Sequence, residues 1–448
     1  MRRRQHNGRT PALQGPASAP TSHRGRARAA LRHPVSQNAI ALYAVQFVLA
    51  LLPLVTLPWM ARVLGPDEIG VVLFTQSFAF LLGMLIEYGF GLSGTRRIAR
   101  ERDDPAAMAA TVGAVQAAKL LLISVATVAA LVAVFLVPEF REDPRLVGFG
   151  WAMAALTGLN PFWFFTGVER LRLVALVDVA VRLLITAAII LLVREEGHGL
   201  RVLWIWTLGS ALSLAALTTM MYRQVGVRKT TSAARRLALT EGWPLFLATA
   251  SVSLYTSGTV FVLGLVTSNA RLAMFAAAER ITRVALRVIG PVSSAAYPRV
   301  SHMLIVGRTE RAQQLSFFVL AFATVFAVLS AVVLYVSAPI VVRLLFGVRF
   351  AETAELVRVM CLMLPGVAVG STLSGLWLLT RGLDRLPTRI AIGVGVSSLV
   401  LTPVVGTVAG PLGVAWLLVA LETTLAITFF LIIRAKRLVP TRAEILGR

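Results

Sequence analysis

The sequence predicts an all-α, multi-pass membrane protein of twelve transmembrane helices, arranged as two parallel six-helix repeats around a central cavity. Its composition, its regularly spaced apolar runs and its internal repeat support this prediction. Of the 448 residues, 57% are hydrophobic and only 15% are charged, whereas soluble domains carry about 25% charged residues. So much apolar surface is stable only where side chains can face lipid.

Apolar runs recur along the chain, and each is close to the roughly 20 residues that a helix needs to cross the hydrocarbon core. The predicted spans are 38–64, 69–94, 109–137, 146–168, 173–193, 202–222, 243–266, 272–297, 314–338, 354–380, 388–408 and 411–433. The eighth span differs from the others, because it carries four charged residues. An even number of spans places both termini on the same side of the membrane.

Net positive charge lies almost entirely on one side of these spans. The chain has a net charge of +23, nearly all of it in the two tails and in the segments 95–108, 169–172, 223–242, 298–313 and 381–389. Positively charged loops stay in the cytoplasm, so we expect both termini to be cytoplasmic. The same distribution argues against a nucleic-acid-binding protein, whose basic residues would gather in one patch.

The second half of the chain repeats the first. An offset of 201 residues aligns Phe74 with Phe275 and Pro138 with Pro339. A repeat of six helices keeps its orientation, which gives parallel bundles related by an axis along the membrane normal. We therefore expect a disordered basic cytoplasmic tail (1–37), a six-helix bundle (38–222), a cytoplasmic linker (223–242), a second six-helix bundle (243–434) and a basic cytoplasmic tail (435–448).

The eighth span carries the most informative charges. Glu279, Arg280, Arg283 and Arg287 fall on one face of a helix. Each ionisable group at bilayer depth costs about 2.5–3.5 kcal/mol on insertion scales, so this face cannot contact lipid. The residues either pair or snorkel locally, or they line a wet cavity that attracts an anion. Their depth in the span favours the cavity.

Other charges in the spans are less informative. Asp178 and Arg182 are spaced i, i+4 and are expected to neutralise each other. Glu87 and Glu422 have no partner nearby in the sequence, so each either pairs with an Arg of another helix or carries a coupling proton. Lys119 is expected to snorkel from a helix end.

Catalytic and metal-binding patterns are absent from the sequence. No Gly-rich loop ends in Gly-Lys-Ser/Thr, which argues against ATP hydrolysis by this chain. The single cysteine, Cys361, and the spacing of the five histidines predict no metal site and no catalytic residues. We therefore expect a protein that is not an enzyme and needs no cofactor.

Three stretches resemble Wzx-type polysaccharide flippases of the multidrug/oligosaccharidyl-lipid/polysaccharide (MOP) exporter superfamily. They are PWMARVLGPDEIG at 58–70, EYGFGLSGTRRIA at 87–99 and PFWFFTGVER at 161–170. The eighth span, from Ala276 to Arg299, also resembles that family. Two features depart from the family pattern: the long basic N-terminal tail, and Thr166 at a position where the family usually has Gln.

This resemblance implies the MOP exporter fold and a bacterial inner-membrane location. It implies movement of an undecaprenyl-pyrophosphate-linked oligosaccharide from the cytoplasmic to the periplasmic leaflet, for O-antigen, capsule or exopolysaccharide assembly. A proton or sodium gradient is the implied energy source, and a polysaccharide polymerase and glycosyltransferases are implied partners beside the membrane lipids. The family's cationic cavity positions carry over to Arg280, Arg283 and Arg287.

Other functions remain open on the sequence. A drug/cation antiporter of the same superfamily would need acidic residues facing its cavity, whereas the candidates here are net basic. A lipid II flippase usually carries two additional helices. A membrane-bound polysaccharide-assembly enzyme is disfavoured because the predicted loops are short, and a scaffold without transport activity is the remaining alternative.

Overall fold

The computed structural model describes residues 34–254, 258–436 and 438, and for residues 34–51, 54, 251–252 and 287–292 it describes the backbone only. The two predicted tails, 1–37 and 435–448, therefore lie largely outside the described residues. The chain divides into two compact units, Met1–Val48 and Leu49–Arg448. The packing and the cavity described below belong to the second unit.

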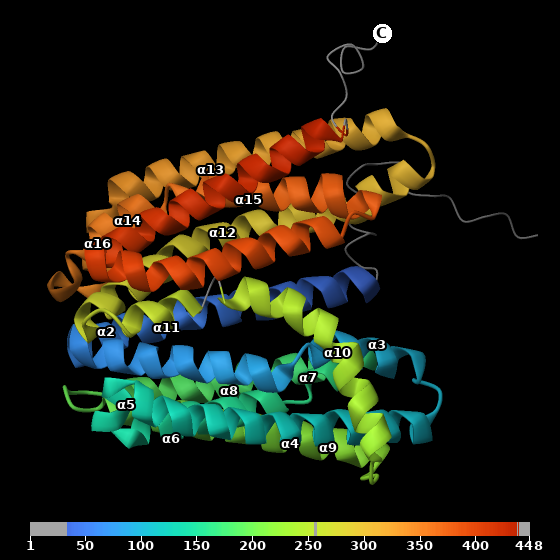
Figure 1. Ribbon diagram of the computed structural model, residues 1–448, viewed down its shortest axis with the longest axis horizontal. Helices are drawn as coiled ribbons and strands as arrows, with labels where there is room; N and C mark the ends of the chain where they lie inside the picture. Colours follow the sequence, from blue (N-terminus) through green and yellow to red (C-terminus); the bar gives the residue numbers. More distant parts are fainter. Residues whose placement is uncertain (1–33, 255–257, 437, 439–448) are drawn as a thin grey trace, which may run out of the picture. The chain divides into compact units, whose positions relative to one another are not determined.

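Every regular element in the described ranges is a helix (Figure 1). The first predicted bundle contains α2 (Pro34–Glu87), α3 (Phe90–Arg100), α4 (Pro105–Leu136), α5 (Pro138–Glu142), α6 (Pro144–Leu159), α7 (Phe162–Gly167), α8 (Leu171–Leu192) and α9 (Gly199–Val225). The second contains α10 (Ser232–Ser253, which starts in the predicted linker), α11 (Thr259–Gly264), α12 (Asn269–Ile305), α13 (Thr309–Phe346), η2 (Val348–Phe350), α14 (Thr353–Met360), α15 (Met363–Leu373), η3 (Ser374–Leu378), η4 (Leu379–Arg381) and α16 (Arg385–Ala435). The predicted all-α fold is confirmed.

Two of these helices each contain two predicted spans. α2 is broken at Gly65, with φ 77°, and α16 at Gly410, with φ 61°. Glycine adopts this left-handed region readily because it lacks a Cβ. At a rise of about 1.5 Å per residue, α16 is long enough to cross about 30 Å of hydrocarbon twice. The predicted count of twelve spans stays a prediction.

Seven helical stretches of the described chain are long and apolar enough to cross a membrane. They are Val55–Arg100, Pro105–Leu136, Leu171–Leu192, Gly199–Val225, Thr309–Phe346, Thr353–Arg381 and Arg385–Ala435. The charged helix α12 is not among them. Because a charged face is costly in lipid, α12 needs an environment that the other helices provide.

One large apolar core joins the two predicted bundles at one end. Phe74 and Phe78 of α2 pack against Phe261 of α11, with ring centroids 5.1 and 5.7 Å apart. Gly264 lies so close to Phe74 that a Cβ there would be 2.5 Å from the ring. Phe140 of α5 completes this aromatic cluster. The charge distribution predicts that this end is periplasmic.

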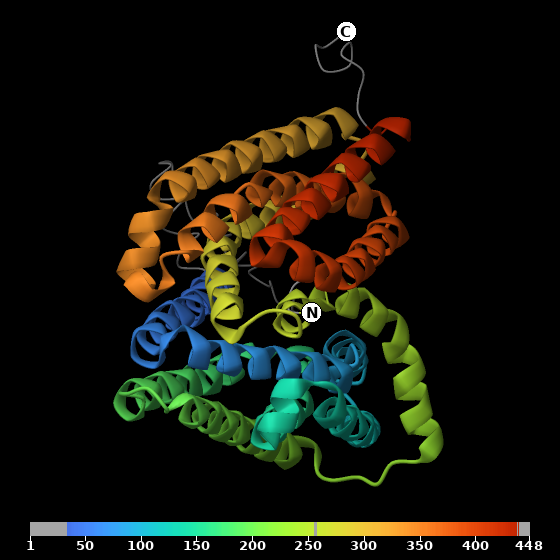
Figure 2. The ribbon, with the colours of Figure 1, turned by 60° about the vertical axis from the view of Figure 1, so that its left-hand side comes forward.

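Near the opposite ends of the helices, the described buried residues form separate clusters. One includes Phe90, Val115 and Trp163 of the first bundle, and another includes Trp377 and Phe429 of the second. α10 is the exception, because it packs on α3 and α4 although it follows the linker (Figure 2). The two bundles therefore share a core at one end but are held differently at the other.

Candidate functional site

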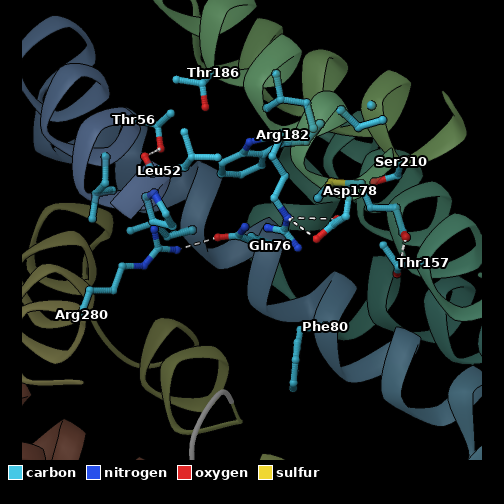
Figure 3. A pocket seen from close by; sticks show the side chains of 18 of the residues that line it. Leu52, Thr56, Gln76, Phe80, Thr157, Asp178, Arg182, Thr186, Ser210 and Arg280 are labelled. Atoms are coloured by element: carbon cyan, nitrogen blue, oxygen red, sulfur yellow. Dashed lines mark hydrogen bonds and ion pairs between the residues drawn. The ribbon is translucent and has the colours of Figure 1, made fainter. Parts of the chain in front are cut away.

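A cavity of about 820 Å³ lies between the two predicted bundles. Its walls come from α2, α6, α8 and α9 on one side, and from α11, α12 and the end of α13 on the other. Figure 3 shows the side chains that project into it. A volume of this size is within the range of sites that bind small molecules.

α12 supplies a charged face to this cavity. Glu279 is 7% exposed, and Arg283 donates to its Oε1 from Nε at 3.1 Å. Arg280 donates from Nη2 to Oε1 of Gln76 on α2 at 2.7 Å (Figure 3). All three charged residues line the cavity. Arg287 lies on the same helix, but its side chain is outside the described part of the structure.

α8 supplies a second charged pair. Arg182 donates from Nε to both carboxylate oxygens of Asp178, each at 3.1 Å. The two side chains remain 51% and 32% exposed, and both line the cavity. The i, i+4 spacing of the sequence therefore forms a local ion pair, and the structure adds that the pair faces open space.

The described lining carries one positive charge in excess. Three arginines and two carboxylates line the cavity. Asp178 pairs with Arg182 and Glu279 pairs with Arg283, whereas the hydrogen-bond partner of Arg280 is a neutral amide. A positive charge that water screens poorly interacts strongly with an anion. The α12 wall is therefore suited to a phosphate or carboxylate ligand, and Arg can bind either through two parallel hydrogen bonds.

Uncharged polar side chains are scattered over the remaining wall, which is otherwise largely apolar. Hydroxyl groups come from Thr56, Ser77, Thr157, Thr186, Ser210 and Ser213, and amides from Gln76 and Asn160. The Nδ2 of Asn160 donates to Oγ of Ser213 at 3.3 Å, and its Oδ1 accepts the backbone N–H of Phe162 at 3.1 Å. Asn160 thus sits at the break between α6 and α7. These residues cannot be predicted from the sequence, because single polar residues in apolar helices form no recognisable pattern.

The prediction that Lys119 snorkels to the membrane surface is wrong. Its side chain is 1% exposed, and Nζ donates to the carbonyls of Gly158 at 2.7 Å and Asn160 at 3.3 Å. These carbonyls are at the C-terminal end of α6, where a helix leaves unpaired acceptors and a partial negative charge. Lys119 therefore holds the α6–α7 break in place instead of reaching for the membrane surface.

The remaining predicted candidates do not line the cavity. The Glu87 carboxylate accepts the backbone N–H groups of Gly89, at 2.9 Å, and Gly91, and so caps α3. Glu422 lies on α16 at the point where that helix passes close to Gly366 of α15. Both belong to places where helices begin or pack.

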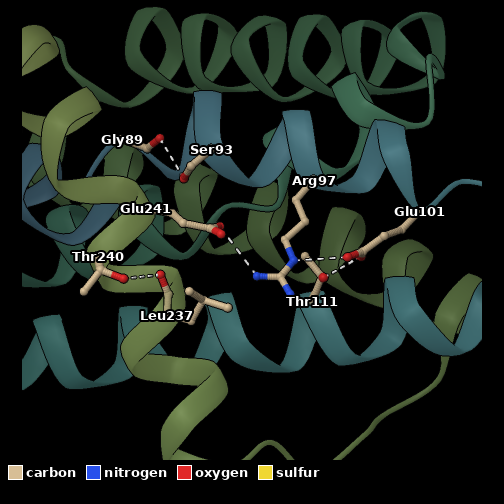
Figure 4. Close-up of polar contacts among 8 residues, drawn as sticks. All are labelled: Gly89, Ser93, Arg97, Glu101, Thr111, Leu237, Thr240 and Glu241. Carbon is tan, nitrogen blue, oxygen red and sulfur yellow. Dashed lines mark hydrogen bonds and ion pairs between the residues drawn. The ribbon is translucent and has the colours of Figure 1, made fainter.

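Polar contacts tie α10 to the first bundle near the predicted cytoplasmic side. Arg97 of α3 bridges Glu101, at 3.1 Å, and Glu241 of α10, at 3.5 Å (Figure 4). Thr111 of α4 donates to Glu101 at 2.5 Å. Arg97 and Glu101 together thus connect α3, α4 and α10.

A neighbouring ion pair links the ends of α3 and α7. Arg102 contacts the Glu169 carboxylate at 2.9 Å, and this hydrogen bond lowers the pKa of Glu169. The ion pair is exposed to solvent.

At the predicted periplasmic end, the loop between α8 and α9 contacts both bundles. Trp59 of α2 donates from Nε1 to the carbonyl of Val193 at 3.0 Å, and Glu68 accepts the backbone N–H of Gly197 at 2.5 Å. Glu196 of the same loop pairs with Arg349 beyond α13. These contacts lie at the end where the two bundles share a core.

The chain has the fold of solved transporters of the MOP superfamily. The inward-facing conformation of a multidrug resistance MATE family transporter superposes with a TM-score of 0.69 at 17% identity, covering 88% of this chain and 96% of that one. The lipid II flippase MurJ in an inward closed conformation gives a TM-score of 0.68 at 15% identity, covering 91% and 89%.

Sequence comparison identifies the family within this fold. Residues 35–304 match the family described as polysaccharide biosynthesis protein, and the chain belongs to this family. It is 26% identical over 408 residues to a protein of Escherichia coli K12 named "Putative O-antigen transporter", covering 90% of this chain and 97% of that one. A Shigella dysenteriae protein of the same name is 25% identical, covering 80% and 89%.

Proposed function

We propose that this chain moves a lipid-linked oligosaccharide, joined through pyrophosphate to a polyprenyl carrier, from the cytoplasmic to the periplasmic leaflet of a bacterial inner membrane. The observation that carries this proposal is the cavity, whose described lining has one excess positive charge at Arg280 together with several hydroxyl and amide groups. The positive charge can bind a pyrophosphate, and the hydroxyl and amide groups can form hydrogen bonds with a sugar. The names of the O-antigen transporter relatives support the same substrate class.

The unequal ends of the molecule support alternating access. The bundles share an apolar core and the Glu196–Arg349 pair at one end, whereas the described buried residues cluster separately towards the other. This arrangement matches a state closed towards the periplasm. The TM-score of 0.57 with an outward-facing MATE transporter, against 0.69 with an inward-facing one, is consistent with it.

The location and the energy source follow from the same proposal. The basic segments on one side of the helices favour a cytoplasmic location for both termini. A proton or sodium gradient drives the cycle, and the product passes to a polysaccharide polymerase after glycosyltransferases have built it.

Transport of a cationic drug is the second candidate, since the superfamily fold is shared with MATE transporters. A cation would require excess negative charge on the cavity wall. The described lining has the opposite sign, with three arginines against two carboxylates. Export of anionic, sugar-bearing lipids therefore agrees better with the lining.

Substitution of Arg280 tests the proposal. In cells that depend on this chain for surface polysaccharide, Arg280→Ala should abolish the polysaccharide and leave its lipid-linked precursor in the inner leaflet. Arg280→Lys should restore part of the transport, because it keeps the charge but loses the two-pronged hydrogen bonding. Arg145→Ala, at an exposed ion pair outside the cavity, is the matched control. Normal polysaccharide from Arg280→Ala at equal protein levels would contradict the proposal.

A further inference from the structure

We propose that the Asp178–Arg182 pair makes the cavity selective for oligosaccharides whose sugar next to the pyrophosphate is neutral, and that it rejects an acidic sugar at that position. This inference rests on the proposed function and deepens it, because it assigns a substrate class to a second part of the same cavity.

The Asp178–Arg182 pair is accessible to a ligand in the cavity. The side chains of Arg182 and Asp178, 51% and 32% exposed, lie on the membrane-spanning helix α8 and line the cavity. A pair that only neutralised two charges between packed helices would be shielded by them. Arg182 donates to Asp178 only from its Nε. Its two terminal amino groups have no acceptor among the described residues. Those groups can donate to a ligand while Asp178 accepts.

The pair also lies beside the anion-binding wall. Figure 3 shows Gln76 between Arg280 on one side and Asp178 with Arg182 on the other. Gln76 accepts a hydrogen bond from Arg280 at 2.7 Å. A ligand whose pyrophosphate binds at Arg280 therefore presents its next group to the α8 pair. Ser210 and Thr157, which Figure 3 shows beside Asp178, extend the polar surface there.

The charge balance of the pair determines which sugar it accepts. A neutral sugar offers hydroxyl groups that can accept from Arg182 and donate to Asp178 without separating them. A sugar carboxylate that accepted from the terminal amino groups of Arg182 would bring a second negative charge beside Asp178, and one arginine cannot compensate both. An uncompensated charge in such a site is strongly unfavourable. The cavity therefore selects through repulsion of the wrong ligand as well as attraction of the right one.

Binding of three matched probes to the purified full-length chain in lipid nanodiscs tests this inference. The probes are farnesyl pyrophosphate carrying one glucose, one glucuronic acid or no sugar. The two sugars differ only in a hydroxymethyl group against a carboxylate. We expect the wild-type chain to prefer the glucose probe by about tenfold, which corresponds to about 1.4 kcal/mol.

Two substitutions should shift this preference in opposite directions. Asp178→Asn frees Arg182 and should turn the preference towards the glucuronic acid probe. Arg182→Gln leaves Asp178 unpaired and should strengthen the rejection of that probe. Loss of a purely structural contact could not produce opposite shifts. Asp143→Asn is the matched control, because Asp143 pairs with Arg145 at an exposed site outside the cavity.

The outcomes separate this inference from the proposed function. Arg280→Ala should weaken all three probes equally and leave the glucose-to-glucuronic acid ratio unchanged. If it weakens none of them, the assigned role of Arg280 fails, while the ratio still tests the α8 pair. Equal binding of both sugar probes by the wild type would overturn the inference. The same glucose-to-glucuronic acid ratio in both α8 variants would also overturn it. If one variant fails to fold, a wild-type ratio in the other variant would overturn it.

Discussion

Glu196 and Arg349 form an ion pair between the loop that follows α8 and the short helix η2 that follows α13. The two residues are 153 positions apart and belong to different bundles. Their side chains are more than half exposed, and exposed pairs of this kind contribute about 0–1 kcal/mol. The pair is therefore weak enough to break during a transport cycle.

A cross-link at this pair should stop transport. We expect Glu196→Cys with Arg349→Cys, treated with a flexible thiol-reactive cross-linker that reduction can cleave, to lose polysaccharide export and to regain it on reduction. Holding the two loops together prevents the bundles from separating at that end. Each single cysteine variant, treated in the same way, is the control. Full export by the cross-linked chain would show that this end does not open.

The charge distribution predicts the topology. Reporter fusions after Arg102, Arg236 and Arg308 should report the cytoplasm, and fusions after Glu68 and Glu196 the periplasm. Basic segments are retained on the cytoplasmic side during insertion. Paired phosphatase and fluorescent-protein fusions measure both outcomes. A periplasmic signal after Arg308 would mean that the charged helix α12 does not cross the bilayer.

Gln76→Glu should inactivate the cavity without changing its shape. The new carboxylate would pair with Arg280 and cancel the excess positive charge of the described lining. An anionic ligand would then bind at least about tenfold more weakly, as expected for the loss of a favourable charge interaction of about 1.4 kcal/mol. Binding of farnesyl pyrophosphate to the purified variant measures the effect.

The same variant has a defined pH dependence. A protonated glutamic acid is neutral like Gln76, so binding should recover as the pH falls through the pKa of the new carboxyl. Pairing with Arg280 favours the charged form and moves this recovery to lower pH. Gln76→Met is the control, because it adds no titratable group. A Gln76→Glu variant that binds like wild type at neutral pH would contradict the role of the excess charge.

Lys119→Met should destabilise the chain. The substitution keeps the length of the side chain but leaves the carbonyls of Gly158 and Asn160 without their donor. A buried polar group without a partner costs about 1–3 kcal/mol, so the melting temperature of the purified protein should fall. Lys229→Met, at an exposed position in the linker, is the control. Equal melting temperatures for the two variants would show that Lys119 does not hold the α6–α7 break.

The sequence determines the features of this protein that depend on local order. Apolar runs place the helices, because each run must satisfy its own backbone hydrogen bonds in lipid. The helical period puts Glu279 and Arg283 on one face, and Asp178 and Arg182 on another, so both local pairs follow from an i, i+4 spacing. The charged face of α12 could be recognised for the same reason.

The tertiary structure alone decides the contacts between distant segments. Arg280 meets Gln76 across 204 residues, and Glu196 meets Arg349 across 153. The sequence shows a lysine at position 119, but only the position of the end of α6 makes it a buried donor to two carbonyls. The period of a helix fixes which residues share a face, whereas the packing of whole helices fixes what that face meets. The packing of whole helices depends on many weak contacts along the whole chain.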